Sequence, residues 1–163
     1  MLALRKYPAP VLSQKSSPAE QVDDSIRRLI DAMFRVMEQL MGQGLAAPQV
    51  GVLQRVIVMR VEGVDYAVVN PLIARARGEE KEDEGCLSIP GVRIDVPRAT
   101  SLILKGLDRD GKPFKLKASG GLARVIQHEL DHLDGKLIID YLPKVERLDF
   151  DLNYIKSLQH TTR

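Results

Sequence analysis

Two histidines in the last third of the chain, His128 and His132, stand four residues apart with Glu129 directly after the first. On a helix this spacing places both imidazoles on one face, where they can bind one metal ion beside a carboxylate. A catalytic metal site needs a third protein ligand and one open position. Cys86, the single cysteine of the chain, completes a Cys/His/His set of that open type.

Each of these residues has a simpler explanation when it is taken alone. A histidine pair with a glutamate can arise by chance, and a single cysteine is more often a small buried hydrophobe than a ligand. The setting of Cys86 argues for a ligand. Gly85 before it permits a close backbone approach, and Glu84 can accept a hydrogen bond from a ligand side chain.

A third segment, residues 42–51 (GQGLAAPQVG), has a composition that suits a backbone running close to a bound peptide. Its glycines and alanines leave room for such a ligand. Gln49 offers an amide that can donate to a developing oxyanion. As a generic turn of small residues, the segment would be weak evidence by itself.

Composition limits the classes of protein. With 163 residues, 44% of them hydrophobic, the chain is expected to form one domain over residues 1–163. The formal charge is +2, and the 24 basic residues are interleaved with 22 acidic ones, which does not indicate nucleic-acid binding. No apolar run reaches the ~20 residues that span a bilayer. Because the amino terminus has no signal or transit pattern, we expect a cytoplasmic protein.

Helical spacing of apolar residues predicts helices over residues 23–41 and 121–133 and, more weakly, over 147–159. The methionines of the first helix are expected in the core. The second helix carries the histidine pair. Residues 1–18 are punctuated by prolines, which suits an extended arm laid over the body.

Short runs of β-branched residues predict antiparallel strands. The expected strands are 56–59, 66–69, 92–97, 101–107, 112–117 and a last short one at 137–139. Asn70-Pro71 is expected to close the second of them. The charged residues 77–83 are expected to form a solvated loop without a function.

Taken together, the motifs resemble the peptide deformylase family. G-x-G-L-A-A-P-Q, E-G-C-L-S and Q-H-E-x-D-H occur in that order, and the resemblance extends from Tyr7-Pro8 to about Leu142. It implies an α+β fold, with antiparallel β-sheets packed around a central metal-binding α-helix, an N-terminal helix and a C-terminal helix. It also implies a hydrolase that removes the N-formyl group from the N-terminal formylmethionine of newly made proteins and releases formate.

The resemblance further implies roles for the matching residues. The ligands of one divalent metal ion would be Cys86, His128 and His132. The ion would natively be Fe²⁺, with zinc, nickel or cobalt able to replace it. Glu129 would be the general base and acid, which fits the chemistry, because a metal lowers the pKa of its bound water toward neutrality. Gln49 and the backbone N–H of Leu87 would form the oxyanion hole, and Gly44 would line the peptide groove.

Further substrate-binding positions are expected at Gln43, Gly85, Arg93 and Gly121. Two of them depart from the family pattern, which usually has an aliphatic residue in place of Gln43 and a larger apolar residue in place of Gly121. We therefore hypothesise a relaxed preference for the first side chain of the substrate. Arg98 could pair with Glu84 and brace the Cys86 loop, and the alternative is an ordinary surface contact.

The expected partners are N-formylmethionyl nascent polypeptides, with no membrane and no direct reading of nucleic acid. A weak ribosome association stays open, although residues 144–163, with a net charge of +1, are not expected to carry it. Two alternatives remain. A zinc endopeptidase would generally take its third ligand downstream of the histidines. An inactive metal-containing peptide-binding relative would need a fourth protein ligand.

Overall fold

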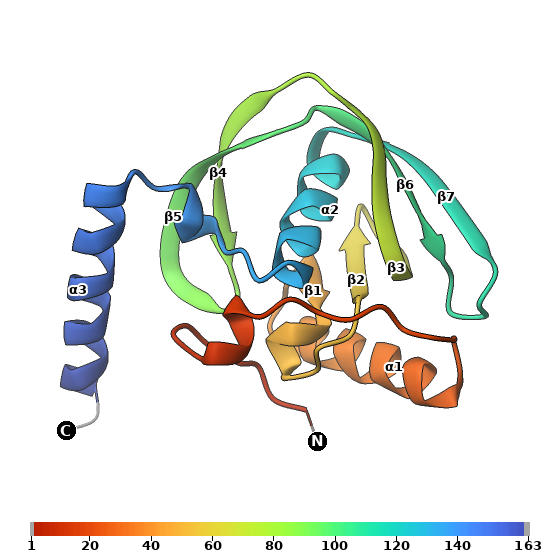
Figure 1. The fold of residues 1–163 in the computed structure, drawn as a ribbon, viewed down its shortest axis with the longest axis horizontal. Coiled ribbons are helices and arrows are strands. Elements are labelled where there is room, and N and C mark those ends of the chain that lie inside the picture. Colours follow the sequence, from red (N-terminus) through yellow and green to blue (C-terminus); the bar gives the residue numbers. More distant parts are fainter. Residues whose placement is uncertain (1, 162–163) are drawn as a thin grey trace.

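The computed structural model describes residues 2–161 and has an α+β fold (Figure 1). Its elements, where η marks a 3₁₀ helix, are η1 (Pro10–Ser13), α1 (Asp24–Gln39), β1 (Gly44–Ala46), η2 (Ala47–Val50), β2 (Val56–Val61), β3 (Val64–Arg77), β4 (Glu80–Cys86), β5 (Ile89–Arg98), β6 (Ser101–Leu107), β7 (Pro113–Ser119), α2 (Gly120–Leu133), η3 (Ile138–Tyr141) and α3 (Lys144–Thr161).

Two antiparallel sheets flank the central helix. The larger has the strand order β1-β2-β3-β6-β7, and the smaller is the β4–β5 hairpin. Helix α2 stands between them and packs on the inner face of the larger sheet through Ala123, Ile126 and Leu133 (Figure 1). The predicted α+β architecture around a central helix is confirmed.

Helix α1 forms as its sequence predicts. The carboxylate of Asp23 accepts a hydrogen bond from the backbone N–H of Ile26 at 3.1 Å and caps the first turn. The apolar stripe of the helix is buried, including Met33 and Met37. Met41 departs from the prediction, because it follows the end of the helix with a φ of 52° and is 92% exposed.

The prediction that Asn70-Pro71 ends a strand is wrong. Strand β3 runs on to Arg77, with an irregular register between Val69 and Leu72. Asn70 has a φ of 53°, and its side-chain amide pairs with the backbone N–H and C=O of Ala19, each at 2.9 Å. The two residues therefore bend the strand without ending it.

Two further predictions need correction. Residues 80–83 are not a loop but part of β4, since their backbone pairs with β5 while their charged side chains stay exposed. Residues 137–139 are not a strand. The chain there enters η3, where the carboxylate of Asp140 accepts a hydrogen bond from the backbone N–H of Leu137 at 2.7 Å.

The amino-terminal arm lies over the body, as predicted. The backbone N–H of Arg5 donates to the carbonyl of Gln49, and that of Tyr7 to the carbonyl of Ser88. The C-terminal helix α3 stands at the side of the molecule (Figure 1). It contacts the arm through the ring of Tyr7. Among residues 2–161, no helix is long and apolar enough to cross a membrane.

Candidate metal centre and peptide cleft

Three potential ligand atoms meet at the inner end of the β4–β5 hairpin. The Nε2 atoms of His128 and His132 are 3.2 Å apart, and the Sγ atom of Cys86 is 3.5 Å from Nε2 of His132. A tetrahedral ion with ordinary metal–nitrogen and metal–sulfur distances holds such pairs roughly 3.3 and 3.6 Å apart. The donor set therefore fits a single divalent ion, and it is the one such cluster among the described residues.

The local fold explains how Cys86 reaches the helix. The pairing of β4 with β5 shifts register between Gly85 and Cys86. Such an irregularity re-aims the side chains at the end of a strand. It brings the thiol to the two imidazoles, which α2 presents one turn apart on one face.

Glu129 is a buried carboxylate that directly follows His128 and lines the same cleft as Cys86. Its side chain is 3% exposed, and its Oε2 atom has no hydrogen-bond partner among the described residues. Burial raises the pKa of the carboxyl to about 7, and the charge of Arg98 acts in the opposite direction. A methyl group on Gly44 would stand only 2.8 Å from Oε1 of Glu129, so a larger residue there would displace the carboxylate. The carboxyl can thus gain or lose a proton near neutral pH.

Gln49 is held by both ends of its amide. Its Oε1 atom accepts from the backbone N–H of Ala46 at 2.9 Å, and its Nε2 donates to the hydroxyl of Ser88 at 3.1 Å. The same Nε2 lies 3.9 Å from Sγ of Cys86, which puts the donor beside one of the three potential ligands. Leu87 lines the adjoining cleft. The role of Ser88 as a partner of Gln49 was missed, although it follows directly after Cys86-Leu87 in the sequence.

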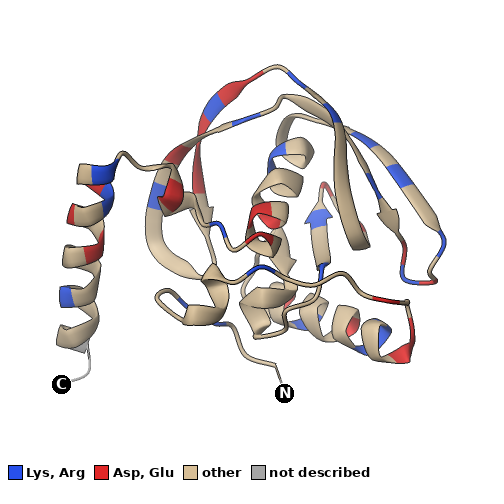
Figure 2. Cartoon of the chain, viewed as in Figure 1, with Lys and Arg blue, Asp and Glu red and all other residues tan. Residues whose placement is uncertain are grey.

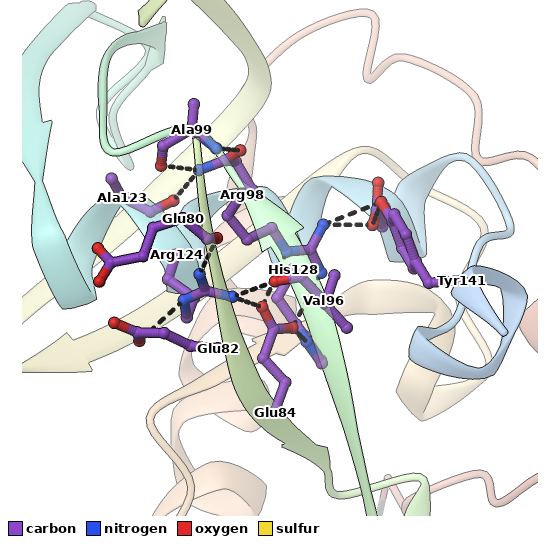
Figure 3. A network of polar contacts seen from close by, with 12 residues as sticks. Glu80, Glu82, Glu84, Val96, Arg98, Ala99, Ala123, Arg124, His128 and Tyr141 are labelled. Carbon is purple, nitrogen blue, oxygen red and sulfur yellow. Dashed lines mark hydrogen bonds and ion pairs between the residues drawn. The ribbon is translucent and has the colours of Figure 1, made fainter. Parts of the chain in front are cut away.

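A buried carboxylate, Glu84, orients the first histidine (Figure 3). Its Oε1 lies 2.9 Å from Nδ1 of His128, and Arg98 donates to both of its oxygens, each at 2.9 Å. The expected Arg98–Glu84 pair is therefore present. An ionised Glu84 fixes the proton of His128 on Nδ1 and leaves Nε2 free to bind an ion.

Further charges complete the Glu84 network, a name used below for Glu84, Arg98, Arg124, His128, Asp131 and Tyr141. Arg124 donates to Oε2 of Glu84 at 2.6 Å, and Arg98 to Asp131 at 2.6 Å. Burial alone would raise the pKa of Glu84, but the hydrogen bonds from Arg98 and His128 outweigh it and lower the pKa to about 2. Arg124 was missed, although it precedes His128 by four residues on the same helix face.

The five expected groove residues all line one cleft of about 750 Å³ that opens beside Glu129. They are Gln43, Gly44, Gly85, Arg93 and Gly121. Arg93 forms an ion pair with Asp83 at the cleft. A methyl group on Gly121 would meet no atom within 4 Å, so this part of the wall is open. The roles of these residues in binding substrate stay predictions.

Comparison with known proteins decides the family. The family model described as polypeptide deformylase matches residues 1–148. The chain belongs to the peptide deformylase family. It is 47% identical over 151 residues to the peptide deformylase of Alkalilimnicola ehrlichii, a match that covers 90% of this chain and 85% of that protein. With the enzyme of Thermodesulfovibrio yellowstonii it shares 42% identity, over 90% of this chain and 92% of the relative.

Crystal structures agree with this family. The peptide deformylase of Ehrlichia chaffeensis superposes with a TM-score of 0.93 at 38% identity, covering 99% of this chain and 98% of the other. A structure of the Ehrlichia enzyme in complex with actinonin gives 0.89 at 40% identity, covering 96% of each chain. As a peptide deformylase, this chain is a metal-dependent hydrolase that removes the formyl group from the N-terminal formylmethionine of newly made proteins.

Proposed function

We propose that Cys86, His128 and His132 hold the divalent ion of this deformylase and that Glu129 moves the proton during hydrolysis. The observation that supports this most strongly is the position of Glu129, whose carboxylate has a buried, unpartnered oxygen and lines the same cleft as Cys86 and His128. A buried carboxylate with no partner costs free energy. A role in catalysis accounts for that cost.

When it is bound, the divalent ion acts as a Lewis acid that makes a water molecule easier to deprotonate. Glu129 takes a proton from the attacking water at its carboxylate and later returns it to the leaving nitrogen, so formate and a free amine are released. Glu84 holds His128 in the tautomer that ligation needs. The absence of a side chain at Gly44 leaves the space that the Glu129 side chain occupies.

Gln49 and Leu87 are assigned to the oxyanion. The side-chain amide of Gln49 and the backbone N–H of Leu87 would donate to the oxygen that becomes negative when water attacks the formyl carbon. Each such donor is worth roughly 3 kcal/mol in other enzymes. The hydrogen bond from Ala46 to Oε1 fixes the amide orientation and so turns Nε2, the donor, toward the ligands.

The identity of the ion, the compartment, the domain organisation and the partners are proposed from the sequence. The native ion is proposed to be Fe²⁺, with Zn²⁺, Ni²⁺ or Co²⁺ able to take its place, because a Cys/His₂ site accepts several divalent ions. The enzyme is proposed to work in the cytoplasm as one catalytic domain over residues 1–163. Its substrates are N-formylmethionyl nascent chains. A weak ribosome association would not depend on α3, since residues 144–163 have a net charge of only +1.

The proposed roles are tested by anaerobic formate release from formyl-Met-Ala-Ser with iron-loaded protein. Glu129→Ala should keep its metal and lose at least about a hundredfold in rate, as expected on removal of a general base. Cys86→Ser should instead lose metal, which elemental analysis measures. If Glu129→Ala retains more than about a hundredth of the rate, Glu129 is not the base. Cleavage of unformylated peptides by the wild type would favour the endopeptidase.

A further inference from the structure

The outer face of the larger sheet carries a group of basic side chains. Residues on β6 and β7 alternate, so one set packs inward on α2 while the other points away from it. The outward set includes Lys105, Lys115 and Lys117, and Arg75 and Arg77 follow at the adjoining end of β3. All five are exposed. These five residues form the basic face.

None of these five cationic groups has a hydrogen bond or ion pair with another described residue, although ion pairs are common elsewhere in the protein. Lys105 lies directly opposite Lys115 in the β6–β7 register. Like charges in that arrangement destabilise a sheet. The sheet therefore tolerates a repulsion that binding of an anion would relieve.

The two arginines reach this face through an irregular strand. Arg75 has a φ of 49°, and the β3–β6 register shifts between Ala74 and Arg77. A residue other than glycine in this conformation costs on the order of 1 kcal/mol. Because a bulge re-aims side chains, it lets Arg75 and Arg77 line the same hollow.

That hollow has a volume of about 370 Å³ and suits an anion. Lys117 lines it with the two arginines, as do Ser101 and Ser119, which are paired across β6 and β7. Ser119 is the N-cap residue of α2, yet its hydroxyl makes no capping hydrogen bond. Guanidinium groups and hydroxyls together can donate several hydrogen bonds to one phosphate group.

Acidic residues are absent from the described part of this face. In the β6–β7 hairpin the acidic residues Asp108 and Asp110 lie at the turn. Along β3, the next acidic residues come only after the end of the strand (Figure 2). The five cations are scattered in the sequence between acidic residues. Strand pairing gathers them, which explains why the interleaved charge pattern gave no indication of a basic surface.

We propose that the basic face binds the phosphate backbone of RNA without reading its bases. Residues two apart on a strand are spaced roughly 7 Å, so the cations extend over a row that suits a chain of phosphates better than one phosphate. No described aromatic side chain is paired into this face, so bases have nothing to stack on. Leu72 is its one large exposed apolar residue, which is too little for insertion into a membrane.

The basic face and the catalytic cleft lie on different sides of α2, because the cleft opens at the residues of β4, β5 and β1. RNA bound at the basic face would leave the cleft open for peptides. The proposal therefore separates two measurable properties. RNA affinity depends on the basic face, and deformylation of free peptides does not.

The test is fluorescence anisotropy of metal-loaded protein with a labelled RNA hairpin of about 20 base pairs, in about 50 to 200 mM salt. The wild type should bind with a slope of log affinity against log salt of about −4.5, as five phosphate contacts to a duplex predict. Arg77→Glu with Lys117→Glu should weaken binding at least tenfold and keep formate release. Arg75→Gly, which tolerates the positive φ, should also weaken it and serves as the variant least disturbing to the fold.

Lys15→Glu with Arg35→Glu is the matched control. Both residues are exposed elsewhere, and the double variant has the same net charge as the first. If the control variant binds RNA within about twofold of the wild type, the proposal is supported. If it loses as much RNA affinity as Arg77→Glu with Lys117→Glu, overall charge and not the basic face sets the affinity. The proposal also fails if the wild type does not bind RNA, or if vesicles rich in anionic lipid bind the basic face and displace the RNA.

Discussion

The Glu84 network and the basic face differ in how they accommodate charge. In the network, Glu84 and Arg98 are almost completely buried, and each charge has a partner of opposite sign. On the basic face five cations are exposed and unpaired within the described residues. A buried charge without a partner costs several kcal/mol, whereas water solvates an exposed one. Paired charges can therefore fix the position of a ligand, while unpaired ones remain available to a partner.

The largest effect should come from breaking the network. Glu84→Gln would remove the buried anion that Arg98 and Arg124 share, leaving only Asp131 to Arg98, and should lower the free energy of unfolding by about 3–5 kcal/mol. Urea denaturation of the metal-free proteins measures this without a contribution from bound metal. Asp65→Asn is the matched control, since Arg60 also grips Asp65 with two nitrogens, but at the surface. Similar losses of unfolding free energy in the two variants would show that burial does not determine how much the ion pair stabilises the fold.

The second largest effect should come from crowding the side chain of Glu129, the proposed general base. Gly44→Ala would place a methyl group 2.8 Å from Oε1 of Glu129 and push the carboxylate aside. A displacement of that kind should lower kcat/KM about a hundredfold with little change in metal content. Gly121→Ala is the control, because its methyl group meets nothing within 4 Å. Full activity of Gly44→Ala would mean that the carboxylate does not need this fixed position.

The open wall of the cleft gives a smaller effect. The wild type should prefer formyl-Met over formyl-Leu or formyl-Phe peptides by less than about a hundredfold, because Gly121 leaves space for larger groups. Gly121→Leu should narrow the cleft and lower kcat/KM for the phenylalanine substrate about tenfold relative to methionine. A strong preference for methionine in the wild type would contradict the relaxed-specificity hypothesis.

The smallest expected effect lies on the basic face. Lys115→Thr removes one of two lysines that oppose each other across β6 and β7. It should raise the free energy of unfolding by a few tenths of a kcal/mol up to about 1 kcal/mol, while RNA affinity falls. Thermal unfolding at low salt measures the gain, with Lys112→Thr in the adjoining turn as control. No gain would mean that the opposed charges are already screened.

The features that could be predicted from the sequence are those formed by residues close together in the chain. The histidine pair on its helix could be read from residue types and intervals, and the Arg98–Glu84 pair, which the sequence left open, joins positions only fourteen apart. Strand limits could not be predicted in this way, because Asn70 is held by the backbone of Ala19, fifty-one positions away. Residues 80–83 pair through backbone groups that do not depend on their charged side chains. The basic face exists only after three strands have paired.

The same dependence on distant partners sets the order in which the enzyme can mature during its own synthesis. Arg5 and Tyr7 leave the ribosome early, but their backbone partners, Gln49 and Ser88, follow much later. The phenol of Tyr7 cannot donate its hydrogen bond to Asp151 until that residue, 144 positions along the chain, has also been made. One of the first segments to be translated thus cannot complete its contacts until nearly the whole chain has been made.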